Sequence, residues 1–281
     1  MVDIYNGVIY NSGNFSQVAD AISIEVALSI AVNGVPFTVT MQTPGNEIEL
    51  ARGLLYTENI FTEPSIFPEV EIVSRNQEGY ITALNMVVDS RYIIKDFANT
   101  RNVISASSCG ICGKTELDEF HGIKINVSEK LEADLIPKMF EQISRGQSDF
   151  KQSGGTHAAG AFDIDGHMLT MQEDIGRHNA VDKVIGYLII NRLLSEAKCI
   201  TVSGRISFEI VNKTRLARIP FLAAVSAPSS LAIENAEEAG ITLMAFCRNT
   251  KFTIYSNPQN VAMGNESFVS GKIKTKLQDV E

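Results

Sequence analysis

The sequence predicts an α/β protein whose core combines a partly parallel sheet with crossover helices, preceded by a smaller N-terminal α+β unit. The second half of the chain alternates short apolar strands with helices, at a spacing typical of parallel sheets. The first half instead carries hairpin and alternating strand patterns. With 281 residues, 44% of them hydrophobic and 20% charged, the chain is long and apolar enough for one large domain or two modest ones.

The bulk properties exclude several classes of protein. The net charge of −9 argues against a general nucleic-acid or membrane-surface binder. No apolar run reaches the roughly 18 residues that a membrane span needs. The N-terminus lacks the basic start and apolar core of a signal peptide. We therefore expect a cytoplasmic protein, and in that compartment paired cysteines tend to be chemical rather than structural.

The N-terminal part is predicted as follows. Residues 1–20 are polar and irregular, and we expect a loose leader. From there to residue 105 we expect the small α+β unit. It begins with a β-hairpin over 22–43 that turns at Asn33-Gly34. Apolar spacing then predicts a helix over 43–60, and alternation predicts strands over 69–75, 80–88 and 102–107.

The core domain is expected over residues 119–260, with 261–281 as a tail. It begins with a helix over 131–146, stopped by Gly146, and a hairpin over 156–169 that turns at Asp165-Gly166. The strongest helical periodicity covers 179–197. Three buried strands with two intervening helices follow, over 198–203, 206–217, 221–227, 229–240 and 241–246.

The carboxyl ends of these three strands are the predicted ligand site, because open parallel sheets bind ligands there. The strands run into small residues, hydroxyls and arginines. Two of the ends open helices, whose first amides are free to hold an anion. The arginines at the first and third ends could close a fork around a phosphate. The competing interpretation is ordinary helix capping with the arginines on a solvated rim. The residues are Ser203, Gly204, Arg205, Ser229, Ser230, Phe246, Cys247 and Arg248.

A second polar group lies in the middle of the chain. Gly154 and Gly155 permit a tight turn or a close approach to a ligand, and His157 follows them. Before and within the long helix, His178 and Asp182 stand one turn apart and could pair. A lone histidine is more often a structural hydrogen-bonding group than a catalyst. The other polar side chains here are Glu173, Asp174, Arg177, Asn179 and Lys183, of which Asp174 or Asn179 could cap the helix.

Cys109 and Cys112 form a Cys-x-x-Cys that could bind zinc, cycle as a disulfide or carry sulfur. Zinc is the weakest interpretation. A structural site needs four ligands, and the other two cysteines stand in apolar strand patterns typical of the core. A zinc deaminase would also need a glutamate two residues after its histidine. His157 is followed by Ala158 and Ala159 instead, so we predict no metal site.

The remaining two interpretations are both compatible with the residues. Serines and glycines around the cysteines suit a mobile loop over 106–118, on which an accessible Cys109 could take up sulfur. Cys112 could then receive the sulfur or resolve the persulfide. A dithiol oxidoreductase would instead place Cys109 at a helix N-terminus, and the segment 114–120 could form that helix.

Several long motifs resemble the formate dehydrogenase accessory sulfurtransferases, the FdhD family. They are SSCGICGK, GGTHAAG, EDIGRHNAVDKVIG, SGRISFEIV and IPFLAAVSAPSSLA, in this order. The stretch from Asn33 to Ile60 resembles that family's N-terminal part, and the likeness covers roughly residues 24–256. The N-terminal leader has no matching motif.

The resemblance implies a sulfurtransferase. Sulfur would come from a cysteine desulfurase as a persulfide on Cys109, with Cys112 as its partner. The sulfur would then go to the metal, molybdenum or tungsten, of a bis-pterin cofactor that formate dehydrogenase needs. With molybdenum, this cofactor is molybdenum bis(molybdopterin guanine dinucleotide). The family's cofactor-binding segment maps onto Phe246, Cys247, Arg248, Asn249, Thr250 and Lys251.

The resemblance also implies a core similar to cytidine deaminases, a homodimer, and GDP as a mimic of the bound cofactor. We add His157 and His178 to the strand-end residues as candidate cofactor contacts. Two alternatives remain beside sulfur transfer. One is a non-catalytic chaperone that binds the cofactor and hands it on. The other is a dithiol oxidoreductase.

Overall fold

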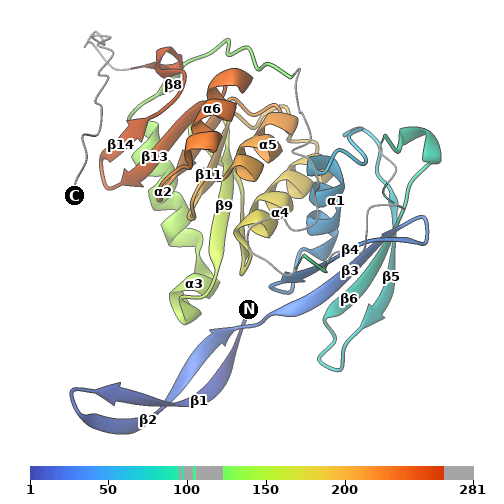
Figure 1. Cartoon of the computed structure of the whole chain (residues 1–281), viewed down its shortest axis with the longest axis vertical. Helices are drawn as coiled ribbons and strands as arrows, with labels where there is room; N and C mark the ends of the chain where they lie inside the picture. Colours follow the sequence, from blue (N-terminus) through green and yellow to red (C-terminus); the bar gives the residue numbers. More distant parts are fainter. Residues whose placement is uncertain (95–96, 98–103, 106–122, 263–281) are drawn as a thin grey trace, which may run out of the picture.

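A six-stranded mixed sheet forms the centre of the molecule (Figure 1). The computed structural model describes residues 1–94, 97, 104–105 and 123–262. The sheet order is β10-β9-β11-β12-β13-β14, and β11, β12 and β13 run parallel, as predicted. The other pairs are antiparallel. The strands are β9 (His157–Phe162), β10 (Met168–Asp174), β11 (Cys199–Val202), β12 (Phe221–Ala224), β13 (Thr242–Arg248) and β14 (Lys251–Ile254).

Helices cover both faces of this sheet, which is why β11 and β12 are buried along their whole length. One face packs against α4 (Arg177–Ile190), α5 (Phe208–Leu216) and α6 (Ser230–Ala239). The other face packs against α2 (Leu135–Gly146), and the short α3 (Ser148–Ser153) leads into β9. The crossover helices predicted between the parallel strands are α5 and α6.

A second sheet of five strands, in the order β5-β6-β3-β4-β7, forms the smaller unit with one helix. The turn at Asn33-Gly34 joins β3 and β4, with both residues at positive φ, as the predicted hairpin requires. The elements are β3 (Val26–Val32), β4 (Val35–Gln42), α1 (Glu47–Thr57), β5 (Glu69–Arg75), β6 (Ile81–Val87), a 3₁₀ turn (Ser90–Tyr92) and β7 (Ile104–Ser105).

The two units are joined where α1 crosses α4. A Cβ placed on Gly53 would lie 1.8 Å from the carbonyl oxygen of Asp182. A Cβ on Gly186 would lie 1.8 Å from the carbonyl oxygen of Glu49. The helices therefore touch main chain to main chain, and only glycine fits at either position.

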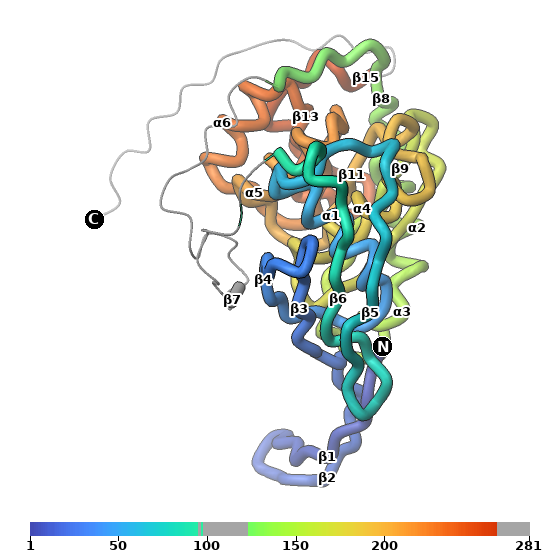
Figure 2. Tube along the Cα trace, turned by 90° about the vertical axis from the view of Figure 1, so that its right-hand side faces the viewer, coloured from blue at the N-terminus to red at the C-terminus, as the bar shows by residue number. Residues whose placement is uncertain are grey.

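The N-terminal leader prediction was wrong. Residues 1–20 belong to a long antiparallel hairpin of β1 (Val2–Asn11) and β2 (Asn14–Ser23). It turns at Ser12-Gly13, both at positive φ, and projects from the body (Figure 2). The strands escaped prediction because neither face is buried, so apolar residues occur on both faces and strict alternation is lost.

Three predicted boundaries also differ. Residues 131–132 form β8 (Leu131–Glu132), which pairs with β15 (Val261–Ala262), so the helix begins at Leu135. The long helix starts at Arg177 and stops at Ile190, because Arg192 takes a left-handed conformation and Leu193 N–H turns back to the Leu188 carbonyl. The last parallel strand continues to Arg248 and returns as β14, and a 3₁₀ turn (Pro258–Asn260) follows.

Within the described ranges, no helix is long and apolar enough to cross a membrane. The predicted loop over 106–118, with Cys109 and Cys112, lies outside the described residues, as do residues 119–122 and 263–281 of the predicted core and tail. Of the strand predicted over 102–107, Ile104 and Ser105 are described.

Candidate functional site

The three predicted strand ends meet at one edge of the central sheet. Ile206 N–H donates to the Ala227 carbonyl at 3.1 Å, and Ser229 N–H donates to the Ile206 carbonyl at 3.0 Å. These bonds hold the segments after β11 and β12 side by side. Phe246 N–H donates to the Ser226 carbonyl at 3.3 Å, which brings in the end of β13. The parallel order thus gathers residues distant in sequence, as predicted from the strand pattern.

His157 opens β9 next to the end of β11. Its Nδ1 lies 3.3 Å from Oγ of Ser203, and the same oxygen accepts the N–H of Ala158 at 2.9 Å. One hydroxyl oxygen therefore contacts both the His157 ring and the main chain at the start of β9. A Cβ on Gly204 would lie 3.3 Å from Nδ1 of His157, so the ring packs closely against this glycine.

Both histidines at this edge are held neutral. Burial lowers the pKa of His157, and the charges of Arg177 and Arg205 lower it further against the opposing charge of Asp174. Burial, with Lys213, Arg177 and His157, lowers the pKa of His178 to about 3. The two rings are therefore hydrogen-bonding groups, not cations, at neutral pH.

The predicted pairing of His178 with Asp182 is wrong. Nε2 of His178 lies 3.3 Å from Oγ of Ser207, just before α5. The Asp182 carboxylate is fully buried beside Lys213, with both oxygens within 2.9 Å of the ammonium. Thr57 of α1 donates to the same carboxylate at 2.6 Å. Asp182 thus joins α1, α4 and α5 and belongs to the core.

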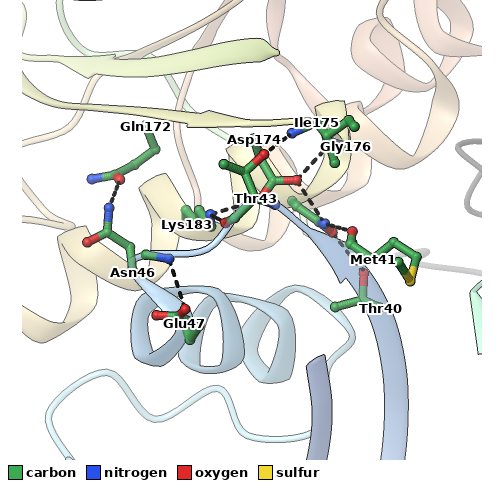
Figure 3. A network of polar contacts seen from close by, with 12 residues as sticks. Thr40, Met41, Thr43, Asn46, Glu47, Gln172, Asp174, Ile175, Gly176 and Lys183 are labelled. Carbon is green, nitrogen blue, oxygen red and sulfur yellow. Dashed lines mark hydrogen bonds and ion pairs between the residues drawn. The ribbon is translucent and has the colours of Figure 1, made fainter. Parts of the chain in front are cut away.

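Asp174 and Lys183 also have structural roles (Figure 3). They form a buried ion pair at 2.8 Å, and Lys183 donates to the Thr43 carbonyl at 2.7 Å. Asp174 accepts the N–H groups of Thr43 and Gly176. The side-chain amide of Asn179 donates both to Asp174 and to the Met41 carbonyl. Neither Asp174 nor Asn179 is the cap residue of α4, which is Gly176, so that prediction was wrong.

Glu173 and the two glycines likewise organise the backbone. Glu173 accepts the first N–H groups of α3, from Asp149 and Phe150, together with the Thr156 hydroxyl. Gly154 ends α3 in a left-handed conformation. Gly155 lies against Ser23 at the base of the hairpin. The polar residues of this region that remain at the candidate site are Arg177, His157 and His178.

The second and third strand ends differ in character. Ser229 caps α6, since its hydroxyl accepts the Ala232 N–H at 3.2 Å, so the capping interpretation holds for this residue. Ser230 and Arg205 are exposed. Because β12 lies between β11 and β13, Arg205 and Arg248 start from strands roughly 10 Å apart. A fork closed on one phosphate stays a prediction.

The segment from Phe246 to Lys251 is a hairpin tip. Phe246 has φ of 55° at a bulge, and its exposed ring lies 6.3 Å from that of Tyr255. Asn249 takes the left-handed conformation that a tight turn needs, a role Asn fills without glycine. Arg248, Asn249, Thr250 and Lys251 are exposed. Tyr255 was missed by sequence reasoning, because the strand was expected to stop at Phe246 and β14 was not predicted.

The isolated cysteines are core residues, as predicted. Burial raises the pKa of the Cys247 thiol to about 12 and raises that of Cys199 as well. Both side chains pack in the apolar cluster between the sheet and α2. The side chain of Cys247 is therefore turned away from solvent, and only its main chain is available to a ligand at the hairpin tip.

The chain leads into the cysteine segment beside this site. Thr40 of β4 pairs with Ser105 of β7, the last described residue before the cysteines. The Thr40 hydroxyl donates to Oδ1 of Asn179 at 3.3 Å, in the first turn of α4 with Arg177 and His178. Cys109 follows Ser105 by four residues in the sequence.

Two buried atoms at the same edge have no hydrogen-bond partner among the described residues. They are Nε of Arg177, which opens α4, and Oε1 of Glu209, in the first turn of α5. Buried polar atoms are normally satisfied. Arg177 lies next to Gly204, where a Cβ would be 3.4 Å from its Cδ. The site therefore contains an arginine, close to the first strand end, whose Nε has no hydrogen-bond partner among the described residues.

Comparisons with known proteins agree on one family. The family model described as FdhD/NarQ matches residues 23–262. The chain is 41% identical over 249 residues to the sulfur carrier protein FdhD of Nocardia farcinica, covering 84% of this chain and 86% of the relative. It is 38% identical over 243 residues to the sulfur carrier protein FdhD of Sulfolobus acidocaldarius, covering 86% of this chain and 91% of the relative.

A solved structure shares the fold. It is described as a proposed formate dehydrogenase accessory protein and comes from Desulfotalea psychrophila. It superposes with a TM-score of 0.73 over 93% of this chain and 99% of its own. At 19% sequence identity this likeness concerns the fold alone.

Proposed function

Because the chain belongs to the FdhD/NarQ family, we propose that it is a sulfur carrier that serves formate dehydrogenase. Sulfur would be bound as a persulfide on Cys109 and passed to a molybdenum or tungsten cofactor carrying guanine dinucleotides. The observation that best supports this is the position of Ser105, which precedes the cysteine segment. Ser105 pairs with Thr40, and the Thr40 hydroxyl contacts Asn179 in the first turn of α4, near the strand ends proposed to bind phosphate.

The chemistry needs two sulfur transfers. In the first, the Cys109 thiolate attacks the outer sulfur of a desulfurase persulfide. A new S–S bond forms at Cys109, the donor's S–S bond breaks, and the donor leaves as a thiolate. In the second, Cys112 attacks Cys109, which releases the outer sulfur as hydrosulfide to the metal and leaves a Cys109–Cys112 disulfide. A thiol reductant must then supply two electrons before the next cycle.

The sheet edge suits the phosphates and base of a guanine nucleotide. The elements that end there carry Arg177, Arg205, Arg248 and Lys251, in a chain whose net charge is −9. Cations of this kind bind phosphate oxygens, and the neutral histidines add polar contacts without repelling them. The exposed ring pair of Phe246 and Tyr255 offers a surface for stacking a base. We propose that this edge binds the cofactor, with GDP as its mimic.

Two further parts of the expectation stay within the proposal. The mixed sheet with α5 and α6 as crossover helices is compatible with a core similar to cytidine deaminases. A homodimer, a desulfurase donor and a cytoplasmic location are compatible with the family. A soluble chaperone without sulfur chemistry, or a dithiol oxidoreductase, would use the same fold differently.

Activation of formate dehydrogenase in cells that lack their own carrier separates these functions. We expect the wild-type chain to restore activity and Cys109→Ala to abolish it. Cys247→Ala is the matched control, because its thiol is buried and chemically inert. If Cys109→Ala restored full activity, the protein would be a chaperone. If the wild-type chain worked without any desulfurase, it would be an oxidoreductase.

A further inference from the structure

A cavity of about 920 Å³ opens at the amino ends of the parallel strands, at the opposite edge of the central sheet from the strand ends proposed to bind the cofactor. It is lined by the C-terminal ends of α1, α4 and α5 and by the segment that leads into β11. Its size is that of a site for a drug-sized organic ligand. Sulfur transfer as proposed above does not use this cavity, which makes it a candidate for a second binding site.

The floor of the cavity is apolar. Five of the lining residues belong to the buried cluster between the sheet and its helices, and none of them is more than 7% exposed: Tyr56, Ile189, Ala197, Leu216 and Ala217. Ile123 and Leu194 pack beside them and are partly buried. The Tyr56 hydroxyl already donates to the Leu216 carbonyl at 3.2 Å. The floor therefore suits an apolar group.

Three cationic side chains line the same cavity, Arg192, Lys198 and Arg218. Its described lining contains no aspartate or glutamate, and none of the three cations forms an ion pair with a carboxylate of the described residues. Arg192 instead has its guanidinium carbon 5.4 Å from the centre of the Phe67 ring, and Lys198 donates to the Ser195 carbonyl at 2.8 Å. Unpaired positive charge is thus gathered at one cavity of a chain whose net charge is −9.

Nearby negative charge balances only part of these cations. The three helix ends carry roughly half a negative charge each. The carboxylates of Glu63 and Glu196 are neighbours in sequence but do not line the cavity. Glu63 is turned to Ser65, whose hydroxyl and N–H both donate to it. The lining therefore keeps a positive charge, which favours an anionic ligand.

Arg192 and Arg218 also occupy positions where glycine is usual. Each is the second residue after the end of its helix, α4 or α5, and has a left-handed φ, 60° and 56° respectively. Helices commonly end in this way, most often with glycine, because a Cβ is unfavourable there. Strained residues of this kind concentrate at ligand sites. The two helix ends thus bring two guanidinium groups to the cavity in spite of a backbone cost.

We propose that this cavity binds an organic anion with an apolar body, an alkyl carboxylate or an alkyl phosphate. The apolar body packs against Tyr56 and Leu216. The anionic group contacts the guanidinium groups of Arg192 and Arg218, which suit carboxylate and phosphate oxygens because they offer paired N–H donors. A nucleotide such as GDP is not suitable, since the polar edges of its base and ribose would be left without partners on this floor. The inference does not rest on sulfur transfer.

Equilibrium dialysis of radiolabelled decanoate against the full chain tests the proposal. We expect one site per chain, with a dissociation constant below about 1 mM. As competitors, decanol and decyl phosphate carry the same chain with no charge and with a phosphate. Decanol should bind at least about tenfold more weakly than decanoate, because it lacks the charge. Decyl phosphate should compete, and its affinity relative to decanoate assigns the site to a phosphate ester or to a carboxylate. GDP should not compete.

Substitutions at the two helix ends test the contacts. Arg192→Asn and Arg218→Asn should each weaken decanoate binding by at least about tenfold. Asparagine tolerates the left-handed backbone, so both variants should fold, which thermal unfolding checks. Lys198→Met keeps the apolar stem, removes the charge and should also weaken binding. Arg145→Asn is the matched control, because it removes a cation from the last turn of α2, on the other face of the sheet, and should leave binding unchanged.

Four results would overturn the proposal. Two are an absence of decanoate binding at about 1 mM and an equal affinity for decanol, which would make the cavity merely apolar. A third is an equal loss of binding in Arg145→Asn and in the two variants of the helix ends, because binding would then follow overall charge. The fourth is displacement of decanoate by GDP, which would assign the anion to the proposed cofactor edge.

Discussion

His157 and Ser203 meet across the boundary between β9 and β11, with Nδ1 and Oγ 3.3 Å apart. The serine also accepts the Ala158 N–H, so one hydroxyl holds both the start of β9 and the ring. Burial and two arginines keep that ring neutral. The contact places a neutral histidine beside the anion-ready edge where the proposed cofactor would lie.

Removing the Ser203 hydroxyl is expected to lower stability and to change the environment of the His157 ring. Ser203→Ala leaves the Ala158 N–H without its acceptor, which should lower the free energy of unfolding by about 1–3 kcal/mol. The ¹⁵N signals of the His157 imidazole should shift, because Nδ1 loses its hydrogen-bond partner. Ser207→Ala is the control, because it should alter the signals of His178 and not those of His157. Unchanged His157 signals in Ser203→Ala would contradict the contact between the ring and this hydroxyl.

Stability should depend on pH through His178. Its pKa is about 3 in the folded protein and about 6.5 in the unfolded chain, so the unfolded state binds the extra proton between these values. The free energy of unfolding should therefore fall as the pH drops below about 6.5, by up to ~1.4 kcal/mol per pH unit. Urea unfolding at pH 7 and pH 5 measures this loss. His178→Gln should show a smaller loss, and an identical loss in both proteins would contradict the account.

The crossing of α1 and α4 gives a prediction opposite in sign to helix propensity. Within a helix, Gly→Ala alone would stabilise by about 1 kcal/mol. Gly186→Ala should instead destabilise by at least about 2 kcal/mol, because its methyl group meets the main chain of Glu49. Thermal or urea unfolding would measure it. Gly7→Ala in β1, where a Cβ makes an ordinary 3.6 Å contact, is the control and should be near neutral.

Guanine nucleotide binding should depend on the hairpin tip of β13 and β14. Arg248→Ala is expected to weaken GDP binding by about 1–3 kcal/mol, the scale of a charge-assisted hydrogen bond. Arg218→Ala is the matched control, since it removes an exposed arginine just before β12, at the amino end of that strand and thus the opposite edge of the sheet. Calorimetry with the full chain measures both. Equal affinities for wild type and Arg248→Ala would remove this residue from the site.

Sequence patterns predicted the parallel strands well because these strands are buried on both faces and read as short apolar runs between capped helices. The same patterns correctly predicted that three strand ends meet at one edge of the sheet. The outer hairpin was missed because β1 and β2 have no buried face to impose alternation. The sequence also does not reveal that Asp182 pairs with Lys213, because the two residues are 31 positions apart.

Within the candidate site, the sequence identified the histidines and the strand ends but not their division of labour. Asp174, Asn179 and Lys183 stand in the same motif as His178, yet they bind the β4–α1 segment, which comes from more than 130 residues earlier in the chain. Hydrophobic periodicity could not identify the glycines of the α1–α4 crossing, because they matter for having no side chain. Tyr255 was not predicted as a site residue, because the turn before its strand contains no glycine.

Intact mass spectrometry after incubation with a cysteine desulfurase and cysteine tests the central claim most directly. The account predicts that the chain gains one reductant-labile sulfur atom, that Cys109→Ala gains none, and that Cys247→Ala gains as much as the wild type. A wild-type chain that gains no sulfur, or a Cys109→Ala variant that gains as much as the wild type, would contradict it.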